Sequence, residues 1–72
     1  MALSTRNKLT GEVVEVVKGD AAAQVTIRVG DNHLVTLITR ESADELGLEP
    51  GQRVTALVKA TDVMLMTDES VA

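Results

Sequence analysis

The sequence predicts an all-β domain that contains one short helix. Residues 24–29 alternate strictly between polar and apolar side chains, as on a half-buried strand. Turn-forming residues separate several valine-rich runs, and only residues 40–47 have the pattern of a helix. A chain of 72 residues has room for one core, so we expect a single domain over residues 1–72.

The first half of the chain is expected to form three strands. Residues 9–17 are rich in valine with polar residues interleaved imperfectly, which indicates a strand with a bulge near Gly11. A short turn separates this run from the alternating strand at 24–29. The turn-forming residues 30–32 and the β-branched, apolar run 33–39 then predict a β-hairpin.

Residues 40–47 predict a helix of one to two turns. Thr39 is suited to the N-cap, acidic residues come early, and Gly47 is placed where a helix commonly ends. Residues 49–51 follow as Glu-Pro-Gly, the order that a type II turn prefers.

Two further strands are expected after this turn, at residues 53–59 and 62–66, because apolar residues again recur at every second position. We expect residues 67–72 to be a frayed tail. Five strands with one short helix between the third and the fourth is the element order of a small five-stranded OB-like barrel.

The composition predicts self-association into a homo-oligomer. The chain is 44% hydrophobic but has no aromatic residue, so only aliphatic side chains and methionine can build the core. One core in so short a chain rarely supplies more than about 3–5 kcal/mol. The sequence has no cysteine for disulfides, and its one histidine, His33, cannot make a four-ligand zinc site. Subunit association is the remaining source of stability, and no residue is expected to ligate a metal cation directly.

Several function classes are disfavoured by the same sequence. It contains no cysteine nucleophile, no Gly-x-Ser-x-Gly motif and no Gly-x-x-x-x-Gly-Lys loop, so we expect no enzyme. A net charge of −4 and the lack of aromatic residues oppose nucleic-acid binding. No apolar run approaches the roughly 20 residues of a membrane span, and the first residues lack a secretory apolar region. We therefore expect a cytoplasmic protein with no membrane association.

Three segments bring charge or hydroxyl groups to the end of an element, at residues 4–6, 39–42 and 59–61. Thr39 and Ser42 flank free backbone N–H groups at the helix start, which suits an oxyanion. An arginine can bind two oxygens at once, while a lysine acts as a point charge. A structural interpretation competes and is the stronger on residue types alone: the hydroxyls cap a helix, and the cations face solvent. Sequence spacing does not show that the three segments meet.

Motifs along the chain carry a family resemblance. The chain opens with Ser-Thr-Arg-Asn-Lys-Leu at residues 4–9, and Ile-Thr-Arg-Glu-Ser at 38–42 precedes Leu-Gly-Leu at 46–48. Val-Lys-Ala-Thr-Asp-Val then follows at 58–63. Together these motifs resemble the molbindin, or Mop, family of molybdate-binding proteins over nearly the whole chain. The motifs at residues 4–9 and 58–63, when they occur together, are specific for this family.

The resemblance implies an OB-like domain whose N-terminal strand is exchanged between subunits. It also implies a hexamer, as a trimer of dimers, that holds molybdate or tungstate between subunits and needs no organic cofactor. The oxyanion-binding residues it implies are Ser4, Arg6, Thr39, Ser42, Lys59, Ala60 through its backbone, and Thr61. A second oxyanion site on the threefold axis is a weaker expectation, at Lys18, Gly19 and Ala21, because Asp20 would repel a dianion unless turned away.

The resulting prediction is an intracellular molybdate store or buffer that makes and breaks no covalent bond. Two alternatives stay open. One is an OB-fold nucleic-acid-binding module, which would need a basic groove and stacking aromatic residues. The other is a purely structural or regulatory oligomerisation module of the kind this family contributes to larger proteins.

Overall fold

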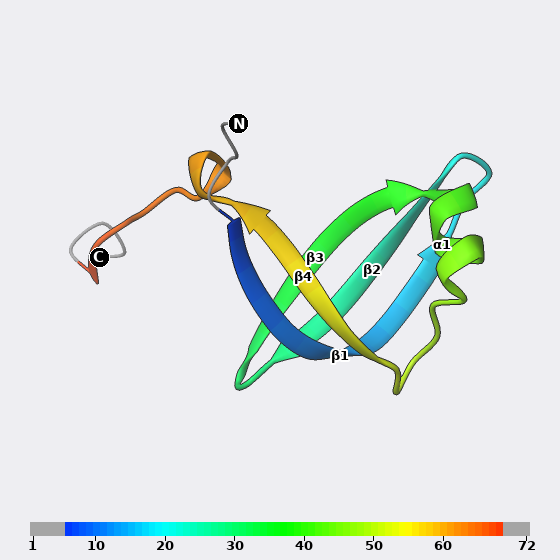
Figure 1. Ribbon diagram of the computed structural model, residues 1–72, viewed down its shortest axis with the longest axis horizontal. Coiled ribbons are helices and arrows are strands. Elements are labelled where there is room, and N and C mark those ends of the chain that lie inside the picture. The colour runs from blue at the N-terminus through cyan, green and yellow to red at the C-terminus, as the bar shows by residue number, and fades with distance from the viewer. Residues whose placement is uncertain (1–5, 69–72) are drawn as a thin grey trace.

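The computed structural model describes residues 6–68, and within them four strands and one short helix form the fold shown in Figure 1. The strands make one antiparallel sheet in the order β3-β2-β1-β4. The elements are β1 (Arg6–Lys18), β2 (Ala22–Val29), β3 (Asn32–Thr39), α1 (Arg40–Leu46), β4 (Arg53–Lys59) and a 3₁₀ turn, η1 (Ala60–Asp62).

The long strand β1 has two different neighbours along its length. Its first half pairs with β4, from Arg6 opposite Lys59 to Glu12 opposite Arg53. Its second half pairs with β2, starting at Glu12 opposite Arg28. The sheet therefore curls around β1 into an open half-barrel, with β3 and β4 as its free edges (Figure 1). The predicted all-β, OB-like fold is confirmed, with four strands in the described residues.

The bulge predicted near Gly11 lies elsewhere. The register of β1 against β2 shifts between Val13 and Glu15, so the irregularity is at Val14. A glycine within a strand marks either a bulge or a close approach of another backbone. Gly11 is the second case: a Cβ atom there would lie 2.4 Å from the carbonyl oxygen of Arg28.

The strand predicted at residues 62–66 is wrong for the described part of the chain. Residues 60–62 form η1, and residues 63–66 are extended without pairing to another strand. A strand is stabilised only by its neighbours, and here the segment leaves the end of β4 and points away from the sheet (Figure 1). The expected exchange of the N-terminal strand between subunits stays a prediction. Within one chain, residues 6–12 of β1 pair with β4, and residues 12–18 pair with β2 except at the irregularity at Val14.

The predicted helix and the turn after it are confirmed. The side chain of Thr39 caps the N-terminus of α1, and Gly47 ends the helix in the left-handed region at φ 60°. In the following turn Gly51 has a φ of 92°, and Gln52 donates its backbone N–H to the carbonyl of Glu49 at 3.2 Å. These values fit the type II turn that the Pro-Gly order predicts.

The core is small, as an aliphatic composition implies. Val13, Val25 and Ile27 form its buried centre. Partly buried residues pack around them from every strand and from the segment after α1: Val16, Val29, Ile38, Leu48, Val54 and Ala56. The same centre forms the floor of an open groove between β3 and β4. Within residues 6–68, no helix has the length and apolar character that crossing a bilayer requires.

Candidate oxyanion site

One group of predicted site residues gathers where β1 begins and β4 ends. Arg6 lies directly opposite Lys59 across the antiparallel pair. Residues in such positions have Cβ atoms about 4.5–5.5 Å apart, so the two cationic side chains leave the sheet side by side. Ala60 and Thr61 follow at once in η1, and all four residues are exposed.

Neither Arg6 nor Lys59 takes part in an ion pair within residues 6–68. Like charges opposite one another across strands are destabilising. A dianion bound here would remove this repulsion and gain two charge-assisted hydrogen bonds. The start of β1 and the end of β4 therefore place two positive charges opposite one another, with no acidic partner within residues 6–68.

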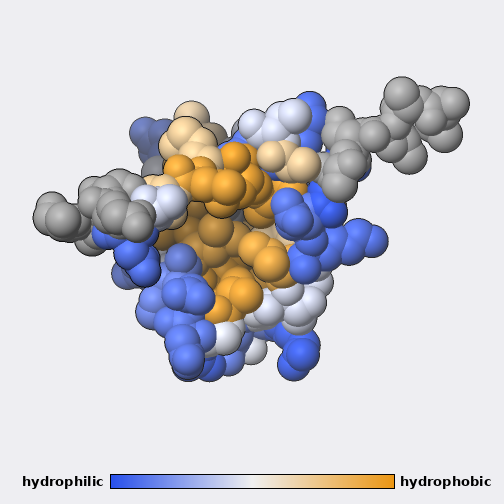
Figure 2. Space-filling view, turned by 90° about the vertical axis from the view of Figure 1, so that its left-hand side faces the viewer, coloured by the Kyte–Doolittle hydropathy of each residue, from blue (hydrophilic) through white to orange (hydrophobic). Residues whose placement is uncertain are grey.

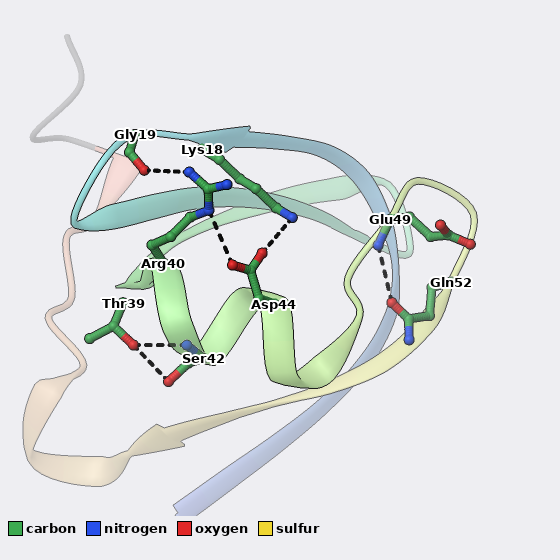
Figure 3. Close-up of polar contacts among 8 residues, drawn as sticks. All are labelled: Lys18, Gly19, Thr39, Arg40, Ser42, Asp44, Glu49 and Gln52. Atoms are coloured by element: carbon green, nitrogen blue, oxygen red, sulfur yellow. Dashed lines mark hydrogen bonds and ion pairs between the residues drawn. The ribbon is translucent and has the colours of Figure 1, made fainter.

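Thr39 and Ser42 make a second group, at the start of α1 (Figure 3). The Thr39 hydroxyl donates to the Ser42 hydroxyl oxygen at 2.8 Å, and the Ser42 N–H donates to the Thr39 hydroxyl oxygen at 3.0 Å. With the Thr39 proton used in this way, the Ser42 hydroxyl keeps its own proton to donate outward. This group offers hydrogen-bond donors that carry no charge.

Removing the Thr39 hydroxyl should weaken the helix as well as this donor group. An N-cap threonine changed to alanine typically costs about 1 kcal/mol. We therefore expect Thr39→Ala to lower the midpoint of thermal unfolding by about 4–8 °C, as measured by circular dichroism. Thr39→Ser keeps the hydroxyl and should retain most of the stability. An alanine variant as stable as the wild type would show that the cap contributes nothing.

A cluster of charged side chains ties α1 to the turn between β1 and β2 (Figure 3). Lys18 Nζ lies 2.8 Å from Asp44 Oδ1, and Arg40 Nε lies 3.3 Å from Asp44 Oδ2. Arg40 also donates from Nη1 to the Gly19 carbonyl at 3.1 Å and from its backbone N–H to the Ala21 carbonyl at 3.0 Å. The hydrogen bond from Lys18 is the main cause that lowers the pKa of the Asp44 carboxyl.

This cluster contains the residues that were predicted for the weaker, second oxyanion site. Lys18 is engaged with Asp44, the carbonyls of Gly19 and Ala21 accept from Arg40, and the Gly19 N–H donates to the Ala22 carbonyl at 2.7 Å. An anion at this turn would have to compete with Asp44 for Lys18. The second site stays a prediction.

The lowered pKa of Asp44 gives stability a pH dependence of known sign. A carboxyl group whose pKa is lower in the folded state stabilises the protein above its unfolded pKa of about 3.9, and this stabilisation is lost as the pH falls through the folded value. We expect the urea midpoint to fall less steeply for Asp44→Asn than for the wild type below about pH 4. Asp31→Asn, in the turn between β2 and β3, is the matched control. Equal slopes for Asp44→Asn and the wild type would contradict this account.

The two groups of site residues lie at opposite ends of the molecule. Figure 1 shows η1 on one side and α1 on the other, with the sheet between them. Arg6 and Lys18 are the two ends of β1, and Thr39 lies beyond the Lys18 end because it pairs with Ala22. A strand of 13 residues has a path of roughly 40 Å. One chain therefore does not bring the two groups to one ion, and Ser4 lies outside the described residues.

Two residues near the site were not assigned a role from the sequence. Asn7 donates from Nδ2 to the Val58 carbonyl at 3.2 Å, which fixes the end of β4 beside Arg6. Arg40 holds the helix start against the turn between β1 and β2. Both residues lie inside the opening and Thr-Arg-Glu-Ser motifs, and this position is the signal that could have identified them. Within residues 6–68, no three His, Cys, Asp or Glu side chains are grouped to hold a metal ion.

Comparison with known proteins places these features in a family. The sequence model of the TOBE domain matches residues 3–65. Molybdenum-pterin-binding protein 2 of Clostridium pasteurianum is 42% identical over 67 residues, which cover 92% of this chain and 98% of that protein. The chain belongs to the molbindin (Mop) family of TOBE domains. The resemblance found in the sequence is thus confirmed.

Solved structures extend the likeness of this Mop domain to its fold. A molybdate-binding protein from Sporomusa ovata is 43% identical with a TM-score of 0.84, over 93% of this chain and 100% of that one. The cytoplasmic molybdate-binding protein ModG, in a form with molybdate bound, is 37% identical with a TM-score of 0.79, over 89% of this chain and 46% of that one. The Mop fold of this chain is that of proteins described as binding molybdate.

Proposed function

We propose that this Mop domain binds molybdate at sites shared between the subunits of a homo-oligomer and acts as an intracellular molybdate store or buffer. One observation carries the shared site: the cationic pair Arg6 and Lys59 and the hydroxyl pair Thr39 and Ser42 lie at opposite ends of one chain (Figure 1). A second copy is the simplest source of the missing group. The hexamer implied by the family resemblance is one assembly that would supply it.

The proposed donors match a tetrahedral dianion in number and kind. Arg6 and Lys59 supply positive charge, while Ser4, Thr39, Ser42 and Thr61 supply hydroxyl groups and Ala60 its backbone N–H. Hydrogen bonds to charged groups contribute about 1.5–3 kcal/mol each. The net charge of −4 opposes this weakly, because fields from distant carboxylates decay over about 8 Å at physiological salt. Four such bonds would outweigh the general repulsion.

The ligand proposed is the oxyanion itself. The Clostridium relative is named for a molybdenum-pterin, whereas the ModG structure is described with molybdate bound. The sequence has no aromatic side chain on which a pterin ring would stack, which favours the free oxyanion without an organic cofactor. Tungstate has the same shape and charge and belongs to the same proposal. We also propose a cytoplasmic location, as ModG is described, and no catalytic activity.

Isothermal titration with molybdate, combined with molar mass from light scattering, tests this function. We expect heat on adding molybdate, little on adding sulfate, and an oligomer that resists dilution better when molybdate is present. A ligand that binds only the assembled form stabilises that form by mass action. No heat with molybdate would refute the ligand, and saturable binding to a monomer would refute the shared site.

A further inference from the structure

The paired strands β1 and β4 carry a third cation beside Arg6 and Lys59. The two strands pair one to one from Arg6 to Glu12 without a register shift, so their side chains alternate strictly between the two faces of the sheet. Lys8 is two positions along β1 from Arg6, and its partner Leu57 is two positions along β4 from Lys59. Residues that are opposite one another, or two positions apart, share a face. Arg6, Lys8 and Lys59 therefore lie on one face.

This face is the outer face of the sheet. On β4 the residues at positions 54, 56 and 58 are half-buried and are among those that line the apolar groove, whereas the residues at 53, 55, 57 and 59 are exposed. Figure 2 shows an apolar hollow on one side of the molecule, rimmed by hydrophilic residues. None of the three cations lines the groove. Their side chains are accessible to an ion that arrives from solvent.

The charge of Lys8 is not used by an acidic neighbour. Lys8 is exposed and makes no ion pair within residues 6–68. Glu12 lies on the same face of β1, but Arg28 holds its carboxylate at 3.0 Å. In the described part of the chain, the lysine and arginine residues without an ion pair all belong to β1 and β4: Arg6, Lys8, Arg53 and Lys59.

Distance decides which of these charges act on an ion held by Arg6 and Lys59. A strand rises about 3.4 Å per residue, so the Cα atoms of Arg6 and Lys8 are about 7 Å apart. Arg53 pairs with Glu12, six positions from Arg6, which is about 20 Å away. Fields decay over about 8 Å at physiological salt. Lys8 therefore acts on the ion, whereas Arg53 is screened from it.

Charge balance shows what a third cation adds. Asp62 lies in η1, three residues after Lys59, and brings one negative charge to the same end of the strands. This charge offsets one of the two cations Arg6 and Lys59. Lys8 restores two net positive charges, which is the number that neutralises a dianion.

We propose that Lys8 is a further binding residue for the oxyanion, beside Arg6 and Lys59. The residues that the family resemblance implies do not include Lys8. The inference rests on the proposed function, because the dianion must bind at Arg6 and Lys59 for Lys8 to reach it. A lysine ammonium group is a point charge on a flexible four-carbon stem, so Lys8 supplies attraction without fixing the orientation of the ion.

Isothermal titration of Lys8→Gln with molybdate at two salt concentrations tests this role. For a dianion about 4–7 Å from a unit charge in water, Coulomb's law gives about a 3- to 10-fold change in affinity. We expect Lys8→Gln to weaken binding by this factor at about 0.1 M salt. The difference from the wild type should shrink to less than about twofold at about 1 M salt, because the screening length falls to about 3 Å. Lys8→Arg keeps the charge and should retain most of the affinity.

Arg53→Gln is the matched control. It removes one positive charge from the same face of the same pair of strands, and we expect it to bind molybdate like the wild type at both salt concentrations. Wild-type affinity for Lys8→Gln at about 0.1 M salt, or an equal loss for Arg53→Gln, would overturn the inference and leave the proposed function standing. No heat with the wild type would refute the proposed function, and the inference with it.

Discussion

Replacing Arg6 with alanine is expected to weaken molybdate binding by about 10- to 100-fold. Arg6 lies opposite Lys59, and the two cations have no acidic partner within residues 6–68, so their charge is available to a dianion. A lost charge-assisted hydrogen bond costs about 1.5–3 kcal/mol, and each 1.4 kcal/mol is a factor of ten. Isothermal titration of wild type and Arg6→Ala measures the change directly.

The control for this experiment is Arg53→Ala. Arg53 is also exposed and also lies opposite a β1 residue, Glu12, but at the other end of the pairing between β1 and β4. The Arg53→Ala substitution removes the same charge from the protein and leaves Arg6 and Lys59 in place. We expect wild-type affinity for Arg53→Ala. The unfolding midpoints of both variants should stay within a few degrees of the wild type, because each substitution removes only one cross-strand charge pair. An equal loss in the two would mean that net charge, and not a site at Arg6, governs binding.

The local patterns of the sequence predicted most elements of the fold because each depends on neighbouring residues. Strict alternation identified β2, the Thr39 and Gly47 caps bounded α1, and the Pro-Gly order identified the turn after it. The failure at residues 62–66 has a physical reason. An apolar run has the propensity of a strand, but pairing decides whether it becomes one, and no neighbouring strand is described for this segment.

The site was less predictable because it depends on which residues pair. Nothing local in Arg6 or Lys59 shows that they lie opposite one another, since the register of β1 on β4 joins positions 53 residues apart in the sequence. The capping contact between Thr39 and Ser42 was predictable, because it lies within one helical turn. That the two groups end far apart in one chain followed only from the structure. Composition points in the same direction, since a thin core without aromatic residues predicts self-association, and that stays a prediction.

Gly11→Ala is expected to cause a large loss of stability. Its Cβ atom would lie 2.4 Å from the Arg28 carbonyl oxygen and 2.7 Å from Ile27 Cγ2, closer than real contacts allow. One of these atoms is backbone and belongs to the paired strand β2, so it cannot rotate away. Overpacking of this kind costs about 1–3 kcal/mol or more. At about 4–8 °C for each kcal/mol, the midpoint of thermal unfolding should fall by about 4–24 °C.

Gly19→Ala is the matched control, because the nearest atom to its Cβ, the Ala22 carbonyl oxygen, lies at 3.4 Å, an ordinary contact distance. We expect its midpoint to stay close to that of the wild type. The comparison also tests the position at which β1 changes its neighbour. Gly11 pairs with β4, and from Glu12 onward β1 pairs with β2. If Gly11→Ala is as stable as Gly19→Ala, then the two strands are not packed as closely as described.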